Sequence, residues 1–185
     1  MPDSKFALAL SGFLLLAFVK AGPAAADAYT TCLGEIADAD LEAKTAYQRA
    51  LRDLIVDRRP EFAELADINR DLQLLLAQMR FARVDYLLTT APERVDGKNG
   101  LSRFRNFDWT QEDLDRMTAN STEYREQSVR LERLKGRNQG HPDWPAMRSF
   151  VRSEMSEGGA FAQITADFIE AGAALEARMA GCSEN

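Results

Sequence analysis

Apolar residues recur every three or four positions along most of the chain, and no segment alternates apolar and polar residues as a half-buried strand does. The clearest pattern follows Pro60, where an apolar heptad seam predicts one long helix. This helix should end near residues 89–91, because Pro92 disfavours a helical residue before it. We expect it to be the most buried helix of the fold. Its seam consists of Leu65, Ile68, Leu72, Leu75, Met79, Ala82 and Tyr86.

Three further helices are predicted around this one. A first helix over about residues 31–58 carries a seam of small residues, which lets a neighbouring helix approach closely. A third helix begins at the capping-box-like residues 110–113 and ends in a turn that contains Gly and Pro. A fourth begins near Asp143 and keeps one apolar phase across Gly158 and Gly159. The fourth element is therefore either one kinked helix or two shorter helices.

The two cysteines of the chain agree with an even number of helices. Four helices in up-down order return the end of the fourth beside the start of the first. Cys32 and Cys182 stand at these two ends, and a disulfide requires their Cα atoms to lie within about 7 Å of each other. We therefore predict one all-α domain over residues 29–185, an antiparallel up-down four-helix bundle whose ends are tied by a disulfide between these cysteines.

Residues 1–28 have the pattern of a secretory signal peptide. Lys5 precedes an uncharged apolar run over residues 6–19, and the small residues that follow fit cleavage after Ala26 or Ala28. This run would span roughly 21 Å as a helix, short of a hydrocarbon core about 30 Å thick, which favours a removed signal over a retained anchor. We predict a periplasmic or otherwise secreted protein, whose cysteines meet an oxidising compartment.

Charge and motif content restrict the chemistry. The 23 Lys and Arg residues against 29 Asp and Glu residues give a net charge of −6, which argues against a nucleic-acid-binding protein. The c-type haem and di-iron patterns are missing. A Ser-His-Asp or Cys-His site would have to use His141, the only histidine, which stands in a turn where a solvated or capping role is more common. We assign no catalytic residue, no metal ligand and no cofactor.

The connection over residues 91–109 is long for a compact helical bundle, where such loops tend to be functional. Its interleaved basic and aromatic residues suit recognition of an anionic or peptide partner. In the alternative interpretation, the aromatic rings close the open end of the bundle and the arginines stay solvated, and both roles can hold at once. Helix order places this segment at the end that holds the cysteines. The candidate binding residues are Arg103, Phe104, Arg105, Phe107 and Trp109.

These observations predict an exported helical interaction module without catalytic activity. Its partner is expected to be another exported or envelope protein, contacted through residues 91–109, with the module acting as an inhibitor, a chaperone-like factor or an accessory subunit. We expect no nucleic-acid partner and no stable membrane anchor after signal removal. A small carboxylate-dependent enzyme and a ligand-binding or metal-binding helical bundle are the alternatives, and the oligomeric state is open.

Overall fold

The computed structural model describes residues 23–95, 97–156 and 159–182, and within them the fold is helical throughout, without a strand. The predicted signal segment lies mostly outside the described residues. The predicted all-α class is confirmed. The long helices are α1 (Pro23–Arg58), α2 (Ala63–Thr90), α5 (Thr122–Gln139) and α7 (Ala160–Cys182). The shorter elements are η1 (Pro60–Phe62), η2 (Pro92–Arg94), α3 (Gly100–Arg105), α4 (Gln111–Asn120) and α6 (Trp144–Ser156).

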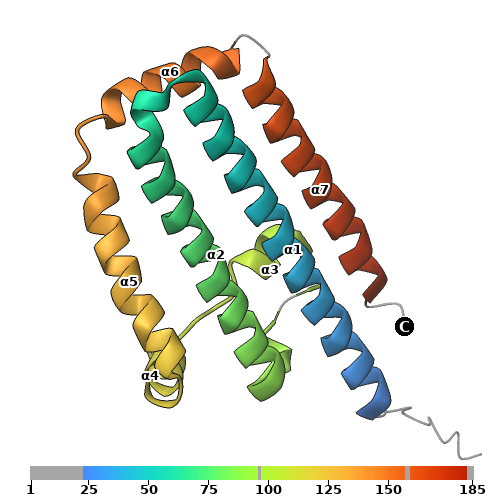
Figure 1. Cartoon of the computed structure of the whole chain (residues 1–185). Helices are drawn as coiled ribbons and strands as arrows, with labels where there is room; N and C mark the ends of the chain where they lie inside the picture. Colours follow the sequence, from blue (N-terminus) through green and yellow to red (C-terminus); the bar gives the residue numbers. More distant parts are fainter. Residues whose placement is uncertain (1–22, 96, 157–158, 183–185) are drawn as a thin grey trace, which may run out of the picture.

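The four long helices lie side by side in the order α5, α2, α1, α7, and each runs antiparallel to its neighbour (Figure 1). In a closed bundle α5 and α7 would be neighbours, whereas here they lie at opposite edges of the row. The up-down order of the long helices is present, but the predicted four-helix bundle is not confirmed. Because the row is open, parts of both faces of α2 stay accessible.

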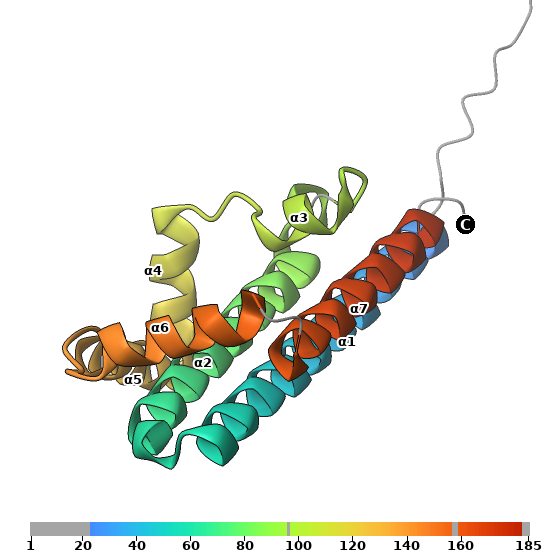
Figure 2. The same cartoon turned by 90° about the horizontal axis from the view of Figure 1, so that it is seen from above.

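The predicted fourth helix consists of two helices. The helix α6 ends at Ser156 and α7 begins at Ala160, while Gly158 lies outside the described residues. The helix α6 crosses one end of the row from α5 towards α7 (Figure 2). Phe150 of α6 packs edge-on against Phe161 of α7, with ring centroids 5.7 Å apart. Because α6 acts as a crossing connection, α7 still returns antiparallel to α1.

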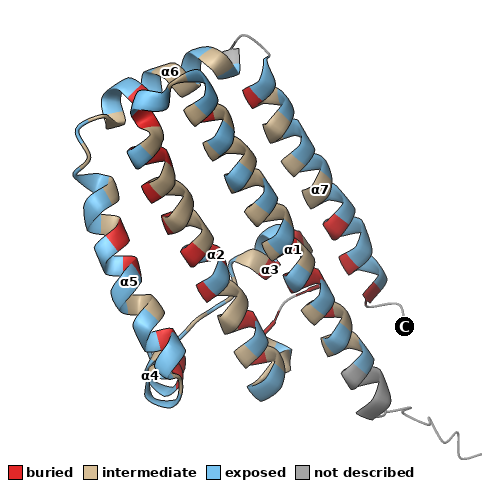
Figure 3. Ribbon diagram, in the orientation of Figure 1, coloured by how far each residue is buried: buried red, intermediate tan, exposed pale blue. Residues whose placement is uncertain are grey.

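Three apolar clusters hold the row together, and α2 contributes to all three (Figure 3). The predicted seam of α2 is buried from Leu65 to Met79, and its last two positions are partly buried. At the α6 end the cluster consists of Ile55, Phe62, Leu65, Ala66, Met147 and Phe161. Beside α4 and α5 it consists of Leu72, Leu75, Met79, Met117, Tyr124, Leu131 and Leu134. At the opposite end it includes Leu33, Ile36, Val84, Leu87, Leu101, Phe104, Leu175 and Met179.

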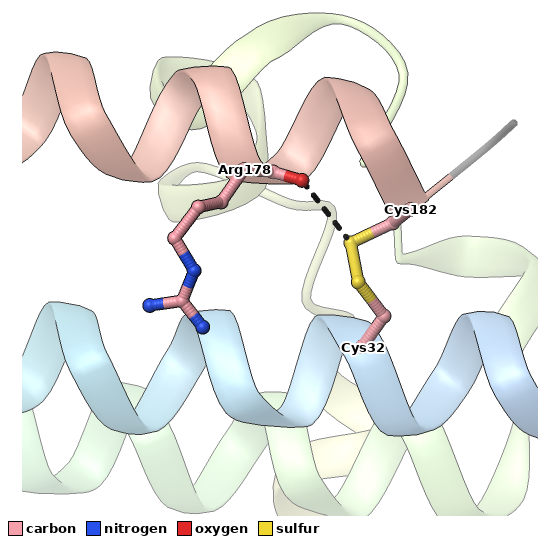
Figure 4. The surroundings of a disulfide bond; sticks show 3 residues. All are labelled: Cys32, Arg178 and Cys182. Atoms are coloured by element: carbon pink, nitrogen blue, oxygen red, sulfur yellow. Dashed lines mark hydrogen bonds between the residues drawn. A yellow bond between two sulfur atoms is a disulfide. The ribbon is translucent and has the colours of Figure 1, made fainter.

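The predicted disulfide is confirmed. Cys32 of α1 and Cys182 at the end of α7 are bonded, with their Cα atoms 5.7 Å apart and a sequence separation of 150 (Figure 4). The carbonyl oxygen of Arg178 lies 3.7 Å from the sulfur of Cys182. The bond therefore ties the two ends of the described chain beside a buried apolar cluster. None of the described helices is both long and apolar enough to cross a membrane.

Candidate functional site

The segment over residues 91–109 is folded, which corrects the expectation of a long loop. It contains η2 and α3, and α3 forms because Leu101 and Phe104, three residues apart, share one buried face. Gly97 lies so close to α1 that a Cβ atom there would be 2.7 Å from Leu33 Cδ2 and 2.8 Å from Tyr29 Oη. The segment is therefore packed against the disulfide end of the row, where helix order had placed it.

The three aromatic candidates of this segment face inward. Phe104 is only 2% exposed, and Phe107 and Trp109 are partly buried against the same cluster. The Trp109 ring contacts Tyr86 of α2 edge-on, with centroids 5.9 Å apart, and the guanidinium of Arg83 lies 5.4 Å from the Trp109 ring centroid. These positions match the interpretation in which the aromatic rings close the end of the fold.

Arg105 contacts a buried carboxylate in α1 rather than standing free at the surface. Its Nε donates a hydrogen bond of 3.0 Å to Asp40 Oδ1, and its Nη2 contacts the same oxygen. Lys44 bonds the other oxygen of Asp40. Burial alone would raise the pKa of Asp40, but the hydrogen bonds and charges of Arg105 and Lys44 outweigh burial and hold that pKa below its ordinary value. Arg105 therefore fastens α3 to α1.

Arg103 is the candidate that stays exposed. Its Nη2 lies 3.2 Å from the carboxylate of Asp108, which is itself exposed. Together with Arg94 and Lys98, Arg103 lines a hollow of about 530 Å³ formed mostly by residues 92–108. Three cations and two carboxylates line this hollow. Of the five predicted binding residues, Arg103 is the one whose charge faces an open cavity.

Arg94, which was not among the candidate binding residues, fixes the position of α4. It forms a forked pair with Asp113, with Nη1 2.9 Å from Oδ1 and Nη2 2.6 Å from Oδ2. Asp113 also closes the predicted capping box, because its Oδ2 accepts from the Thr110 backbone N–H at 3.0 Å. The pair with Arg94, followed by the Thr110 contacts, holds the pKa of Asp113 well below its ordinary value. The segment thereby positions the helix that follows it.

A groove of about 630 Å³ opens between α2 and the α4–α5 pair. The pair exists because α4 ends at Asn120 and Ser121 caps α5 by accepting a hydrogen bond of 3.1 Å from the backbone N–H of Tyr124. Tyr124 is 1% exposed and accepts a hydrogen bond of 2.7 Å from Arg83 Nε. The groove is lined by Leu41, Gln78, Phe81, Ala82, Asp85, Tyr86, Thr89, Thr90, Met117, Asn120, Ser121, Glu123, Tyr124 and Gln127.

The charge of the groove has one sign. Asp85 and Glu123 supply two carboxylates, and no Lys, Arg or His is among the described residues that line the groove. The hydroxyls of Thr89 and Thr90 donate to backbone carbonyls of their own helix, at 2.9 and 2.7 Å, which leaves their oxygens able to accept. The groove therefore presents carboxylate, hydroxyl and amide groups above an apolar floor.

The buried carboxylates and the histidine are held in contacts within the described part of the fold. The two buried carboxylates, Asp40 and Asp113, are each committed to an arginine. His141 accepts a hydrogen bond of 3.3 Å from the backbone N–H of Asp143 within its turn. Among the described residues, no group of three His, Cys, Asp or Glu side chains could hold a metal ion.

No family model matches the sequence, and comparisons with curated proteins and with solved structures give no significant match.

Proposed function

We propose that this chain is an exported binding protein that holds an extended, basic segment of a partner protein in the groove between α2 and the α4–α5 pair. The observation that carries the proposal is the charge of the groove, where Asp85 and Glu123 are the only charged residues among the described ones that line it. Complementary charge steers association and selects partners. A Lys or Arg side chain of the partner is the group that these carboxylates complement.

The rest of the lining suits an extended peptide. Hydroxyl and amide side chains along both walls can pair with a peptide backbone, while Met117 and Tyr124 supply a buried apolar floor. The volume lies within the range of about 300–1,000 Å³ that ligand sites occupy. The groove is also already formed, because Arg94 fixes α4 and Ser121 caps α5, and a preorganised site costs less ordering on binding.

Export is supported by the signal-like residues 1–28 and by the disulfide between Cys32 and Cys182, since such bonds persist in oxidising compartments. The pairing of Asp40 and Asp113 with arginines favours binding over carboxylate catalysis. On the same grounds we propose a periplasmic location and an exported or envelope protein as the partner.

A second contact through residues 91–109 rests on the hollow beside Arg103. Its cations suit an acidic group of the partner, and Pro92 in its lining stands two positions after Thr90, the last groove residue of α2. Replacing Arg103 by Ala should weaken partner binding without lowering the melting temperature, because exposed ion pairs contribute little to stability. Unchanged binding would contradict this second contact but not the proposed binding in the groove.

The groove is tested with a library of random twelve-residue peptides displayed on phage and selected against residues 29–185. We expect selected peptides to be enriched in Lys and Arg, and their binding to weaken with added salt. The double variant Asp85→Asn, Glu123→Gln should bind these peptides at least about tenfold more weakly, which corresponds to about 1.4 kcal/mol.

The matched control is the double variant Glu126→Gln, Glu170→Gln, which removes the same charge at exposed positions outside the groove lining. It should bind as the wild type does. Peptides without basic enrichment, or equal losses in both double variants, would contradict the proposal.

A further inference from the structure

A second, smaller cavity lies on the opposite face of α2 from the groove. Arg80 lines this cavity and Gln78 lines the groove, and two residues along an α-helix turn the side-chain direction by about 200°. The cavity measures about 200 Å³ and is lined by residues of α1, α2 and α7. It is lined by Lys44, Tyr47, Gln48, Gln73, Leu76, Ala77, Arg80 and Phe168.

Its polar lining is cationic. Lys44 and Arg80 carry positive charges, Gln48 and Gln73 supply amides, and within the described part of the chain no carboxylate lines the cavity. This is the reverse of the groove on the other face, whose only charges are negative. The two cavities therefore present charges of opposite sign.

The cations around this cavity exceed the anions that could neutralise them. Asp40 accepts from both Lys44 and Arg105, so one carboxylate serves two cations. Arg80 is half-buried beside them and forms no hydrogen bond or salt bridge with any described residue. The cavity lined by Asp40, Lys44, Arg80 and Arg105 measures only about 10 Å³ and is too small for a ligand. An anion that pairs with Arg80 would therefore enter from the larger cavity.

The aromatic residues give the cavity a fixed apolar wall. Tyr47 of α1 and Phe168 of α7 are stacked, with ring centroids 4.7 Å apart and planes inclined by 27°. The guanidinium of Arg105 lies 5.9 Å from the Phe168 ring centroid. Burial, together with the neighbouring positive charges of Arg80 and Arg105, lowers the pKa of Lys44 despite its pair with Asp40. Excess positive charge is thus held against an apolar surface.

We propose that this cavity binds a small organic anion. Its carboxylate or phosphate lies between Lys44 and Arg80, where the guanidinium supplies forked donors. Its apolar part lies on Tyr47 and Phe168, and the amides of Gln48 and Gln73 donate to the remaining oxygen atoms. The cavity lies below the range of drug-sized sites, about 300–1,000 Å³, so the ligand is small.

Benzoate and inorganic phosphate serve as probes, because they share the oxyanion and differ in the apolar part. Each is titrated into residues 29–185 at constant ionic strength, with sodium chloride as the balancing salt, and side-chain Nε–Hε signals of arginines are followed by NMR. We expect a saturable shift of the Arg80 signal. Benzoate binding more tightly than phosphate identifies an organic acid, and the reverse order identifies a phosphate compound.

Three variants complete the test. Arg80→Gln should weaken probe binding at least about tenfold, followed through the side-chain amide signals of Gln48 and Gln73. Arg130→Gln removes the same charge from an exposed position on α5 and should change nothing. Leu76→Glu, at a position 36% exposed, places a carboxylate beside Arg80 and should block the probes while the fold is kept. Linear shifts that do not saturate, or equal binding in Arg80→Gln and Arg130→Gln, would overturn the proposal.

Discussion

Replacing Arg105 by Ala should destabilise the fold, although this residue was expected at the surface. Asp40 is 6% exposed, and Arg105 contacts its Oδ1 with two nitrogen atoms. Removing one partner of a fully buried ion pair costs about 3–5 kcal/mol. The side chain of Arg105 is 23% exposed and Lys44 still bonds Asp40. We therefore expect the free energy of unfolding to fall by about 2–3 kcal/mol.

Arg103→Ala is the matched control, because it removes the same side chain two positions earlier in the same helix. Its partner Asp108 is 83% exposed, so we expect a loss below about 0.5 kcal/mol. Urea unfolding of the wild type and both variants, followed by circular dichroism at pH 7, gives the comparison. Losses equal within about 0.5 kcal/mol would refute the claim that Arg105 fastens α3 to α1.

The pH dependence of the stability lost in Arg105→Ala gives a second test of the same contact. Because Arg105 and Lys44 hold the pKa of Asp40 below its ordinary value, the folded state binds the proton less readily than the unfolded state does. The contribution of the pair is therefore complete above the unfolded pKa of about 3.9 and is lost as pH falls through the lower folded value. The difference in unfolding free energy between the wild type and Arg105→Ala should be constant from neutral pH to about pH 5 and should shrink below about pH 4. A difference that grows in acid would contradict this assignment.

Three further tests address other parts of the structure. The double variant Cys32→Ser, Cys182→Ser removes a cross-link between residues 150 positions apart. The free energy of unfolding, measured in urea, should fall by up to about 5 kcal/mol, and an unchanged value would contradict a stabilising disulfide. Phe161→Ala, at a position 0% exposed, should cost about 3–5 kcal/mol in the same assay, whereas Val129→Ala, at a position 63% exposed, should cost under about 0.5 kcal/mol. Arg94→Ala should weaken peptide binding in the groove, measured by isothermal titration calorimetry, because α4 loses its contact with Arg94. Unchanged affinity would contradict the role of Arg94 in positioning α4.

The sequence predicted those parts of the fold that depend on local patterns. The seam of α2 between Leu65 and Met79, the capping box at Thr110 and the pairing of Cys32 with Cys182 all follow from spacing and from residue type. The break between α4 and α5 did not, although Ser121 already interrupted the apolar seam there. A serine serves as an N-cap or as an exposed helix residue with equal ease, and only tertiary packing decides between the two.

The open row of helices follows from a second apolar side of α2, which was not predicted from the sequence because only the heptad seam was considered. Ala66, Ala77, Val84 and Leu87 point away from the seam and are also buried, so α2 packs between α1 and α5 rather than facing a single core. The sequence contains this wider apolar surface, but a search for a strict heptad seam does not detect it.

The candidate sites depend on contacts between distant residues. Arg105 and Asp40 are 65 positions apart, and Arg94 reaches Asp113 across 19 positions. Interleaved Arg and aromatic residues have the same composition whether they face solvent or a core, so the sequence could not separate the two roles. The groove joins side chains of four helices, and each of these helices alone has an ordinary polar face.

The central claim is that the groove holds a basic segment of a partner, and photo-cross-linking in exporting cells tests it most directly. Benzoylphenylalanine replaces Gln78 in the groove or, as the control, Glu170 on α7, both exposed. Mass spectrometry then identifies the cross-linked segment. We predict an adduct from position 78 only, to a segment that contains Lys or Arg, and its loss in the Asp85→Asn, Glu123→Gln background. An adduct of equal yield from position 170, or one that survives the loss of both carboxylates, would contradict the claim.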